Sequence, residues 1–580
     1  MIKRLSACIR EYKKQTILTP VCMVGEVVCE CTIPLLTADL INSIQNGCDL
    51  RTILLYGLKL FVIAMLSLGF GALSGWFAAE AAAGFAKNLR HDLYYQVQSF
   101  SFANIDRFST SSLVTRLTTD VTNIQNAFMM CIRIAVRAPM MLVFAVIMSI
   151  RVGKQLAFIF AGTVPILGLA LFCMIRSALP LFKAVFKKYD ALNNSVQENV
   201  QGMRVVKSFV REDYETQKFS AASDSVRADF LKAEKILALN SPVMQFCVYT
   251  SMILISFFAA KLIVTSGGTY LGVGSLTSMI TYSMQILMSL MMLSMIFVML
   301  TMAQASGKRI CEVLGETSSL HNPENPVYEV PNGAVDFDHV EFKYSASAKR
   351  SALSDIDFHV KSGQTVGIIG GTGSAKTTLV QLIPRLYDTS RGTVRVGGKD
   401  VRAYDLAVLR DAVNIILQKN VLFSGTVREN LKWGNADASD EEIWEACRAA
   451  CADEFLNRMP DGLDTVLGQG ASNLSGGQKQ RLCIARALIG KAKILIFDDS
   501  TSAVDTATEK KIREALAARK NVTKIIIAQR VTSVMNTDQI IILDDGKVHR
   551  IGTHAELLAD DPIYQEIYAS QMKGGDENGR

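Results

Sequence analysis

The chain has 580 residues, too many for one hydrophobic core of ordinary size, so we expect at least two domains. Hydrophobic residues make up 49% of it and charged residues 20%, a mixture typical of a membrane half joined to a water-exposed half. The net charge of +7 is modest for this length and excludes the strongly basic surface of a nucleic-acid-binding protein.

The first half of the chain is dominated by hydrophobic segments. Residues 1–15 are basic but lack the apolar core and cleavage site of a signal peptide, so we expect a short amphipathic helix on the inner membrane face. Six segments that follow are each long enough to cross a bilayer as a helix. They cover about 17–40, 53–80, 127–150, 155–176, 241–264 and 276–302.

The connections between these segments predict their orientation. Those at 81–126 and 177–240 are long and rich in lysine and arginine, which places them and both termini in the cytoplasm. Apolar residues at helical spacing predict that the membrane helices extend into the cytosol. Residues 102–108 and 209–214 are the candidates for short crossing elements that join them.

Ionisable residues within the spans come in two pairs, each one helical turn apart. Glu26 and Glu30 lie in the first span, and Arg133 and Arg137 lie in the third. Charged groups in a bilayer face a cavity or each other, so they predict either a substrate or gating contact or an ion pair between helices. The sixth span carries a face of methionines, suited either to promiscuous apolar binding or to plain packing. Its members are Met284, Met288, Met291, Met295, Met299 and Met302.

The second half reads as a soluble domain. We divide the chain into a six-helix membrane domain at 1–303, a helix end and proline-containing linker at 304–332, and a domain at 333–571. Strands alternate with helices across that last domain, which predicts an α/β core. Residues 572–580 are charged and glycine-rich, and we expect them to be disordered.

A glycine-rich turn between a strand and a helix predicts phosphate binding. The strand at 365–369 runs into Gly370, Gly371, Thr372, Gly373, Ser374, Ala375, Lys376, Thr377 and Thr378. In this P-loop pattern, backbone amides surround phosphates, Lys376 reaches the terminal ones, and the Thr377 hydroxyl points at Mg²⁺. Ala375 stands where the usual pattern has glycine.

A second motif completes the predicted phosphate site. The apolar run Ile494–Phe497 predicts a buried parallel strand, and Asp498 and Asp499 follow at its carboxyl end, where α/β sheets place ligands. A carboxylate there can hold Mg²⁺. Before this strand, two glycines and a hydroxyl precede a helix start, whose free N–H groups favour anions. This segment consists of Leu474, Ser475, Gly476, Gly477 and Gln478.

Together these motifs resemble those of ATP-binding cassette (ABC) exporters, in the half-transporter arrangement. The Leu474–Gln478 segment is similar to the family signature, and the resemblance extends to 198–212 and 421–430. It implies a membrane all-α domain of six helices followed by an α/β P-loop nucleotide-binding domain. It also implies that ATP and Mg²⁺ are the cofactors.

The resemblance assigns roles to individual residues. Tyr344 resembles the aromatic residue that stacks on adenine, and residues 370–378 the Walker A segment that binds ATP. Gln418 resembles the Q-loop glutamine, and with Thr377 and Asp498 it would contact Mg²⁺. Residues 502–505 resemble the D-loop, which ends at Asp505.

Four positions depart from the family pattern. Asp499 replaces the glutamate that polarises the attacking water, and Gln529 replaces a histidine near the γ-phosphate. A glutamine cannot become a cation there. Ala375 and Gln469 also differ from the usual residues. Because phosphoryl transfer depends on positioning and electrostatics, we expect this chain's own site to bind Mg-ATP and hydrolyse it poorly.

Family sites form between two domains that face head to tail. The resemblance therefore implies a heterodimer in which the signature residues and Asp505 complete a catalytic site on a second half-transporter with intact catalytic residues. The expected activity is ATP-driven export of drugs or lipid-like amphiphiles across the plasma membrane. Two alternatives on the same fold are an ATP-binding regulatory subunit of a channel and an uptake transporter. A soluble ABC enzyme acting on nucleic acid is excluded by the six spans.

Overall fold

The computed structural model describes residues 1–266, 270–345, 347–500 and 504–576. They form two compact units. The first comprises Met1–Gln98 and Ser109–Glu316, and the second comprises Ser99–Phe108 and Thr317–Arg580. The boundary at Glu316 falls inside the linker predicted at 304–332, whereas the assignment of Ser99–Phe108 to the second unit was not predicted.

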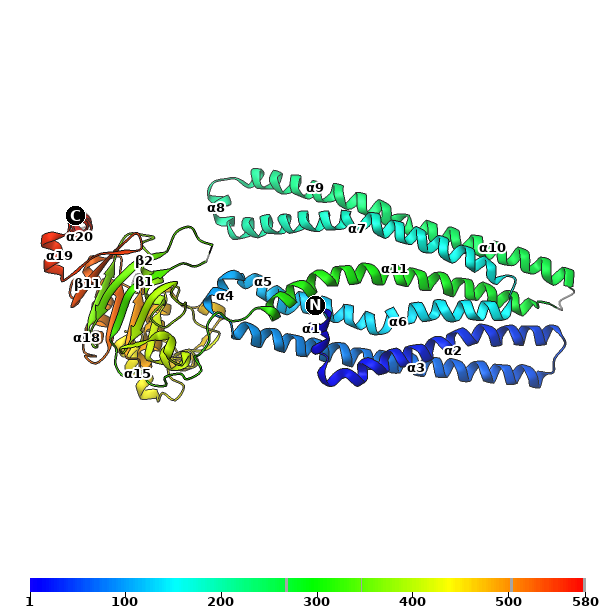
Figure 1. Cartoon of the computed structure of the whole chain (residues 1–580), viewed down its shortest axis with the longest axis horizontal. Coiled ribbons are helices and arrows are strands. Elements are labelled where there is room, and N and C mark those ends of the chain that lie inside the picture. The colour runs from blue at the N-terminus through cyan, green and yellow to red at the C-terminus, as the bar shows by residue number, and fades with distance from the viewer. Residues whose placement is uncertain (267–269, 346, 501–503, 577–580) are drawn as a thin grey trace. The chain divides into compact units, whose positions relative to one another are not determined.

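The first unit is a bundle of long helices that run side by side (Figure 1). Its helices are α1 (Ile2–Ala7), α2 (Lys13–Gln45), α3 (Leu50–Gln98), α5 (Thr110–Thr115), α6 (Val121–Val152), α7 (Ala157–Gln201), α8 (Met203–Ser208), α9 (Glu212–Ala238), α10 (Asn240–Ser266) and α11 (Val273–Gly315). A 3₁₀ turn (Arg10–Tyr12) precedes α2, and a π turn (Arg116–Asp120) precedes α6. Five predicted spans lie within one helix each, and the fourth, predicted from 155, begins two residues before α7; α3, α7 and α11 continue well beyond the predicted spans, as expected.

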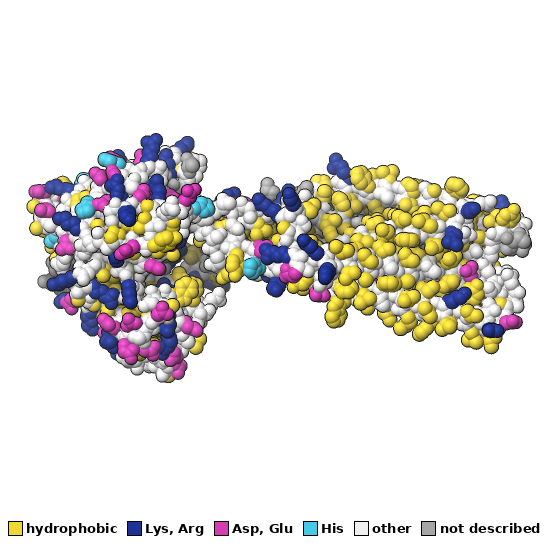
Figure 2. Space-filling view, turned by 60° about the horizontal axis from the view of Figure 1, so that its bottom comes forward, with side chains coloured by type: hydrophobic (Ala, Val, Ile, Leu, Met, Phe, Trp, Pro, Cys, Tyr) yellow, Lys and Arg dark blue, Asp and Glu magenta, His cyan; other side chains and the backbone are white. Residues whose placement is uncertain are grey.

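The surface of this bundle requires an apolar solvent. Within the described residues, six helices are long and apolar enough to cross a membrane. The most apolar window of α3 contains no buried residue, so its side chains point outward from the bundle. Figure 2 shows a broad band of hydrophobic side chains on the surface of the helical unit. A band of this extent would aggregate in water, and the lipid core of a bilayer solvates it.

One of the two predicted crossing elements lies where it was predicted, and the other does not. The first is confirmed as the short helix α4 (Phe102–Arg107), capped by Ser101. The second was predicted at 209–214, but the short helix is α8, six residues earlier, and α9 already begins at Glu212. The turn between α8 and α9 contains Val210 with a φ of 53°. A β-branched residue in this left-handed conformation is rare, which explains why the sequence did not reveal the turn.

The second unit is built on a six-stranded sheet in the order β12-β11-β3-β10-β9-β6, parallel except for β12 at one edge. A four-stranded antiparallel sheet, β2-β1-β4-β5, lies beside it (Figure 1), and β7 pairs with β8. The strands are β1 (Val335–Phe342), β2 (Leu353–Val360), β3 (Thr365–Ile369), β4 (Arg391–Val396), β5 (Lys399–Asp400), β6 (Val413–Ile416), β7 (Gly425–Thr426), β8 (Val466–Leu467), β9 (Ile494–Asp498), β10 (Thr523–Ile527), β11 (Gln539–Asp544) and β12 (Lys547–Gly552).

Helices surround these sheets and complete the core. Besides α4 they are α12 (Lys376–Gln381), α13 (Leu406–Ala412), α14 (Val427–Leu431), α15 (Asp440–Ala449), α16 (Asp453–Leu456), α17 (Gly476–Ile489), α18 (Thr506–Ala517), α19 (His554–Asp560) and α20 (Pro562–Asp576). Every residue of β9 is buried, as expected for a central parallel strand. Helix α20 runs on to Asp576, so part of the tail predicted to be disordered from 572 is helical.

Helix α4 packs against the sheet unit through aromatic residues. The Tyr387 hydroxyl donates to Asp106 Oδ2 over 2.6 Å, and the Phe102 ring meets the Tyr387 ring edge to face at 6.0 Å between centroids. Tyr387 is itself 8% exposed and touches Phe342. These contacts attach α4 to the sheet unit, although in the chain it directly follows the membrane helix α3.

Candidate nucleotide-binding site

A cavity of about 500 Å³ lies at the carboxyl end of the parallel strands β3, β9 and β10. The turn after β3 forms one wall and the residues after β9 and β10 form another. The lining residues are Tyr344, Arg350, Ser351, Ala352, Gly370, Thr372, Gly373, Ala375, Lys376, Thr377, Thr378, Gln418, Asp498, Asp499, Ile527, Gln529, Asp545 and Gly546. Most residues predicted for the Walker A segment and the magnesium site therefore meet in one place.

The turn after β3 has the backbone of an anion cradle. Gly373 has a φ of 86°, and Ala375, the residue before α12, has a φ of 68° in the left-handed region. This conformation is unfavourable for alanine and explains why glycine is usual at that position. Nothing lies within 4 Å of where a side chain on Gly371 or Gly373 would begin, so the loop leaves open space for phosphate oxygens beside its N–H groups.

Lys376 is placed to meet terminal phosphates. Its Nζ donates to the carbonyl oxygens of Gly370 at 2.9 Å and Gly371 at 2.8 Å, and to Ser374 Oγ at 3.2 Å. Burial lowers the pKa of this ammonium, and the charges of Asp499 and Asp498 act in the opposite direction. The cation is therefore held at the cavity wall in a partly desolvated setting, where its attraction for phosphate is strong.

Thr377 and Asp498, the predicted magnesium ligands, are in direct contact. Thr377 Oγ1 donates to Asp498 Oδ1 over 2.9 Å. Asp498 is 1% exposed, and its Oδ2 is buried with no hydrogen-bond partner among the described residues. Burial raises the pKa of Asp498, and the neighbouring charge of Asp499 raises it further. A desolvated carboxylate with a free oxygen beside a threonine hydroxyl fits Mg²⁺, which takes oxygen ligands.

Asp499, at the position of the catalytic acid, is held by amides. Gln529 Nε2 donates to Asp499 Oδ2 over 2.7 Å, and the Gln418 side chain also hydrogen-bonds Asp499. Burial raises the pKa of this carboxyl, and these two hydrogen bonds oppose the rise. Residues 499 and 529 come together because β9 and β10 are adjacent parallel strands, with Asp498 opposite Ile527. The three predicted residues Gln418, Asp499 and Gln529 thus form one cluster.

Tyr344 lies at the mouth of the cavity. Its ring is half exposed and packs edge-on against Phe342 and Tyr387, and its hydroxyl hydrogen-bonds Thr378 Oγ1 at 2.8 Å. A ring with one side packed and one side open can accept a flat aromatic ligand. Sequence reasoning missed Arg350 and Asp545, which form an ion pair at the same mouth. The only available signal was the hairpin turn at Asp545, since Arg350 comes from an irregular loop.

The signature segment is well formed and lies outside this cavity. Ser475 caps α17: its hydroxyl accepts from Gln478 N at 3.3 Å, and the Gln478 side chain accepts from Ser475 N at 2.9 Å. Leu474 is buried, whereas Gly476 is open to solvent. Asp505 caps α18 by accepting from Thr508 N at 2.9 Å. The predicted D-loop residues Ser502 and Ala503 lie outside the described residues.

The sequence and fold are similar to those of known transport proteins. Residues 16–291 match the family described as ABC transporter transmembrane region, and residues 353–502 match the family described as ABC transporter. An uncharacterized ABC transporter ATP-binding protein of Bacillus subtilis, YfiB, is 38% identical over 550 residues that cover 95% of each chain. An ATP-dependent lipid A-core flippase of Aromatoleum aromaticum is 32% identical over 529 residues, which cover 90% of this chain and 86% of the flippase.

The fold as a whole also matches a solved structure. A bacterial Atm1-family ABC exporter with ATP bound superposes with a TM-score of 0.81, over 97% of this chain and 99% of that one. The two are 24% identical, so the similarity is one of fold. It confirms the predicted fold class of six membrane-type helices followed by an α/β nucleotide-binding domain.

Proposed function

This chain belongs to the ABC transporter family as an ATP-driven, multi-pass membrane half-transporter with the exporter fold, and we propose that it is the degenerate-site subunit of a heterodimer. In this proposal its own cavity binds Mg-ATP and hydrolyses it slowly. Its signature segment completes a fast site on a partner half-transporter that has the usual glutamate and histidine. Both termini and the nucleotide-binding domain lie in the cytoplasm.

The observation that carries the proposal is the environment of Asp499. This carboxylate is one methylene shorter than glutamate, and it accepts hydrogen bonds from Gln529 and Gln418. These hydrogen bonds occupy lone pairs of the carboxylate that an attacking water would need, and they oppose the rise in its pKa that burial causes. Gln529 cannot supply a positive charge to a γ-phosphate. Mg²⁺, held by Thr377 and Asp498, would neutralise phosphate charge, so binding is retained while water activation is lost.

The intact signature supports the second part of the proposal. Ser475 and Gln478 form a reciprocal cap, which leaves the first N–H groups of α17 oriented outward for an anion. Within the described residues, this segment does not line the chain's own cavity. The signature segment therefore keeps an anion-binding helix start that the chain's own cavity does not use. A subunit that completes the nucleotide site of its partner needs such a segment.

For the substrate, we propose drugs or lipid-like amphiphiles that enter from the bilayer. The relative from Aromatoleum aromaticum is named as a lipid A-core flippase, which supports an amphiphilic substrate. Methionine side chains along α11 that are open to solvent also support it, because flexible thioethers adapt to apolar groups of many shapes.

The test is to purify the tagged chain from its native membranes and identify the protein that co-purifies. We expect a second half-transporter with glutamate and histidine at the positions of Asp499 and Gln529. ATP turnover by this complex should change by less than about twofold in Asp499→Asn, whereas Ser475→Arg should lower it by about 100-fold, because it blocks the partner's site. A homodimer with fast turnover that Asp499→Asn abolishes would contradict the proposal.

The same preparation distinguishes the regulatory-subunit alternative. Lys376→Ala empties the chain's own site of ATP without altering Ser475. If this chain only regulated a channel, transport of candidate amphiphiles would continue at the wild-type rate in that variant. We expect transport to fall, because closure of the paired domains needs nucleotide at both sites.

A further inference from the structure

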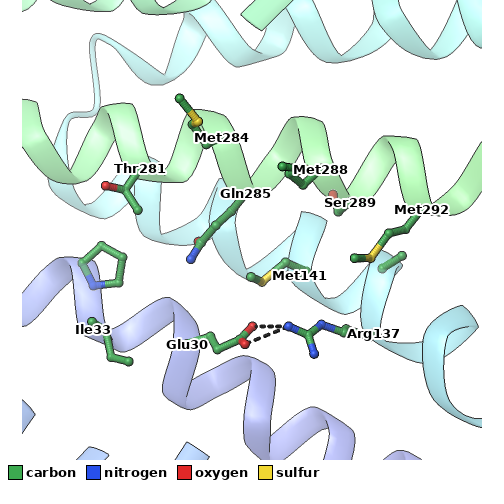
Figure 3. A pocket seen from close by; sticks show the side chains of 12 residues that line it. Glu30, Ile33, Arg137, Met141, Thr281, Met284, Gln285, Met288, Ser289 and Met292 are labelled. Atoms are coloured by element: carbon green, nitrogen blue, oxygen red, sulfur yellow. Dashed lines mark hydrogen bonds and ion pairs between the residues drawn. The ribbon is translucent and has the colours of Figure 1, made fainter. Parts of the chain in front are cut away.

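The first unit contains a cavity of about 440 Å³ between α2, α6 and α11 (Figure 3). Four methionines line it: Met141 from α6 and Met284, Met288 and Met292 from α11. The face differs from the predicted one, because the cavity is lined by Met292 and not by Met291 or Met295. A volume of this size is in the range of small-molecule pockets, and thioethers suit apolar bodies of varied shape.

A charged cluster stands at one wall of the cavity: Glu30 and Arg137 line it, and Glu26, which does not line it, contacts Arg137 from behind. Arg137 donates to Glu26 Oε1 at 2.8 Å and to the two Glu30 oxygens at 2.7 and 2.9 Å. Figure 3 shows Glu30 and Arg137 facing each other on the wall opposite α11. Arg133 lies one turn away on α6, but its guanidinium is next to Gly75 on α3 and does not line the cavity. Two carboxylates therefore surround one guanidinium.

The other polar groups of the wall include acceptor oxygens with unused capacity. The hydroxyls of Thr281 and Ser289 donate to backbone carbonyl oxygens within α11, so their oxygen lone pairs can still accept a hydrogen bond. Gln285 Oε1 is buried and has no hydrogen-bond partner within the described part of the chain. In Figure 3 the Gln285 side chain reaches into the cavity with its amide nitrogen at the tip, and a 180° turn of the amide presents the oxygen there instead. A ligand with N–H donors would satisfy these acceptors.

We propose that this cavity binds the head of a cationic amphiphile that carries N–H donors. The head lies between Glu30 and Gln285, and the apolar body lies along Met141, Met284 and Met288. The excess carboxylate charge compensates the cation, and the low local dielectric strengthens that attraction. This inference rests on the proposed export of amphiphiles and specifies their charge. An ion pair that only held α2 against α6 would leave ligand affinity independent of ligand charge.

The experiment measures equilibrium binding by fluorescence anisotropy, without nucleotide, to the full chain purified with its partner in lipid nanodiscs. Two dyes on the same xanthene skeleton serve as probes: rhodamine 123, a cation with amino groups, and fluorescein methyl ester, which has oxygen atoms in their place. We expect rhodamine 123 to bind at least about tenfold more tightly. Glu30→Gln should weaken it by about tenfold or more, because one charge-assisted hydrogen bond is lost.

Two further variants serve as controls. Asp39→Asn removes an exposed carboxylate from the same helix outside the cavity and should leave the affinity unchanged. Gln285→Leu leaves the ion pair intact and should lower the affinity for rhodamine 123 a few-fold. This variant tests the site even if Glu30→Gln does not fold. Equal affinities for the two dyes, no binding of either, or equal affinities in Glu30→Gln and Asp39→Asn would overturn the inference.

The binding measurement tests the proposed site, and the transport measurement tests the proposed function. Charge-selective binding without ATP-driven transport would contradict the proposed function and support the site. Transport of rhodamine 123 with an affinity that Glu30→Gln leaves unchanged would support the proposed function and overturn the site.

Discussion

Gln529 Nε2 lies 2.7 Å from Asp499 Oδ2, so a neutral amide donates to the side chain that occupies the position of the catalytic acid. Asp499 is held at the edge of the cavity by this bond and by Gln418. The departures at 499 and 529 therefore meet in one hydrogen bond, and reversing one of these two residues without the other leaves the pair mismatched.

Reversal of both departures should restore hydrolysis. In a complex whose partner lacks its own catalytic glutamate, we expect Asp499→Glu with Gln529→His to raise ATP turnover by at least about tenfold, the scale of a positioned general base. Each single substitution should give much less, because the two groups act together. The measurement is phosphate release by the purified complex. A double variant no faster than its parent would show that the loss of activity lies elsewhere in the chain.

Magnesium binding should depend on pH through Asp498. Burial and the charge of Asp499 raise the pKa of Asp498, which favours its protonated form, whereas Mg²⁺ needs the carboxylate. The affinity for Mg-ATP should therefore fall as the pH decreases toward this raised pKa. In Asp499→Asn the neighbouring charge is gone, so the decline should begin at a lower pH than in the wild type.

A titration of Mg-ATP binding between pH 4.5 and pH 8 would measure this shift. Protonation of ATP itself is the same for both proteins and cancels in the comparison. A decline that began at the same or a higher pH in Asp499→Asn would show that Asp499 does not act on Asp498 through its charge.

Ala375→Gly should stabilise the nucleotide-free protein. Ala375 has a φ of 68°, a conformation that costs an alanine about 1–2 kcal/mol. Part of this gain is lost to the greater freedom of glycine in the unfolded chain, so the net gain should be up to about 1 kcal/mol. Gly373→Ala is the matched control: with a φ of 86° and open space around it, it should destabilise by a similar amount. If the denaturant midpoints of both variants shifted in the same direction, the left-handed backbone would not be the cause of the stability changes.

Removal of Arg137 alone should lower the free energy of unfolding strongly, whereas removal of all three charges of the cluster should lower it little. Arg137→Leu leaves Glu26 and Glu30 partly buried without a cation, which should lower the free energy of unfolding by about 3–5 kcal/mol. The triple variant with Glu26→Gln and Glu30→Gln should recover most of that loss, since no unpaired charge remains. Unfolding by SDS in mixed micelles would measure both. A single variant within about 1 kcal/mol of the wild type would contradict the role of Arg137.

Tyr387→Phe should loosen α4 locally. The substitution keeps the ring contacts with Phe102 and Phe342 but removes the 2.6 Å bond to Asp106. Loss of a hydrogen bond to a charged acceptor costs about 1.5–3 kcal/mol, so amides in 102–107 should exchange with solvent at least about tenfold faster. Tyr404→Phe, which removes a bond to Val396 O, is the control and should leave this segment unchanged.

The parts of the fold that the sequence predicted well are those set by local pattern. The six spans follow from apolar length, and β3 and β9 follow from buried runs that end at ligand-binding turns. The contact between Thr377 and Asp498 was predictable because the carboxyl ends of parallel strands share one edge of a sheet. The hairpin of β11 and β12 was predictable from the turn at Asp545 and Gly546.

The parts that the sequence did not reveal depend on tertiary contacts. The start of α9 at Glu212 was missed because Val210 adopts a left-handed conformation that its residue type disfavours. Arg350 was missed because it reaches the cavity from an irregular loop. The sequence allowed either a substrate contact or an ion pair between helices for Glu26, Glu30 and Arg137. The ion pair depends on how α2 packs against α6, which no local pattern reveals. Which methionines face the cavity was likewise set by how α11 packs.

Helix α4 belongs to the second unit although its neighbours in the chain on both sides belong to the first. The polypeptide therefore passes from one unit to the other at three points: between Gln98 and Ser99, between Phe108 and Ser109, and between Glu316 and Thr317. A domain joined by a single tether can swivel freely about it. Here the backbone itself joins the nucleotide-binding domain to the ends of three helices, α3, α5 and α11, so each of them is covalently linked to any displacement of that domain.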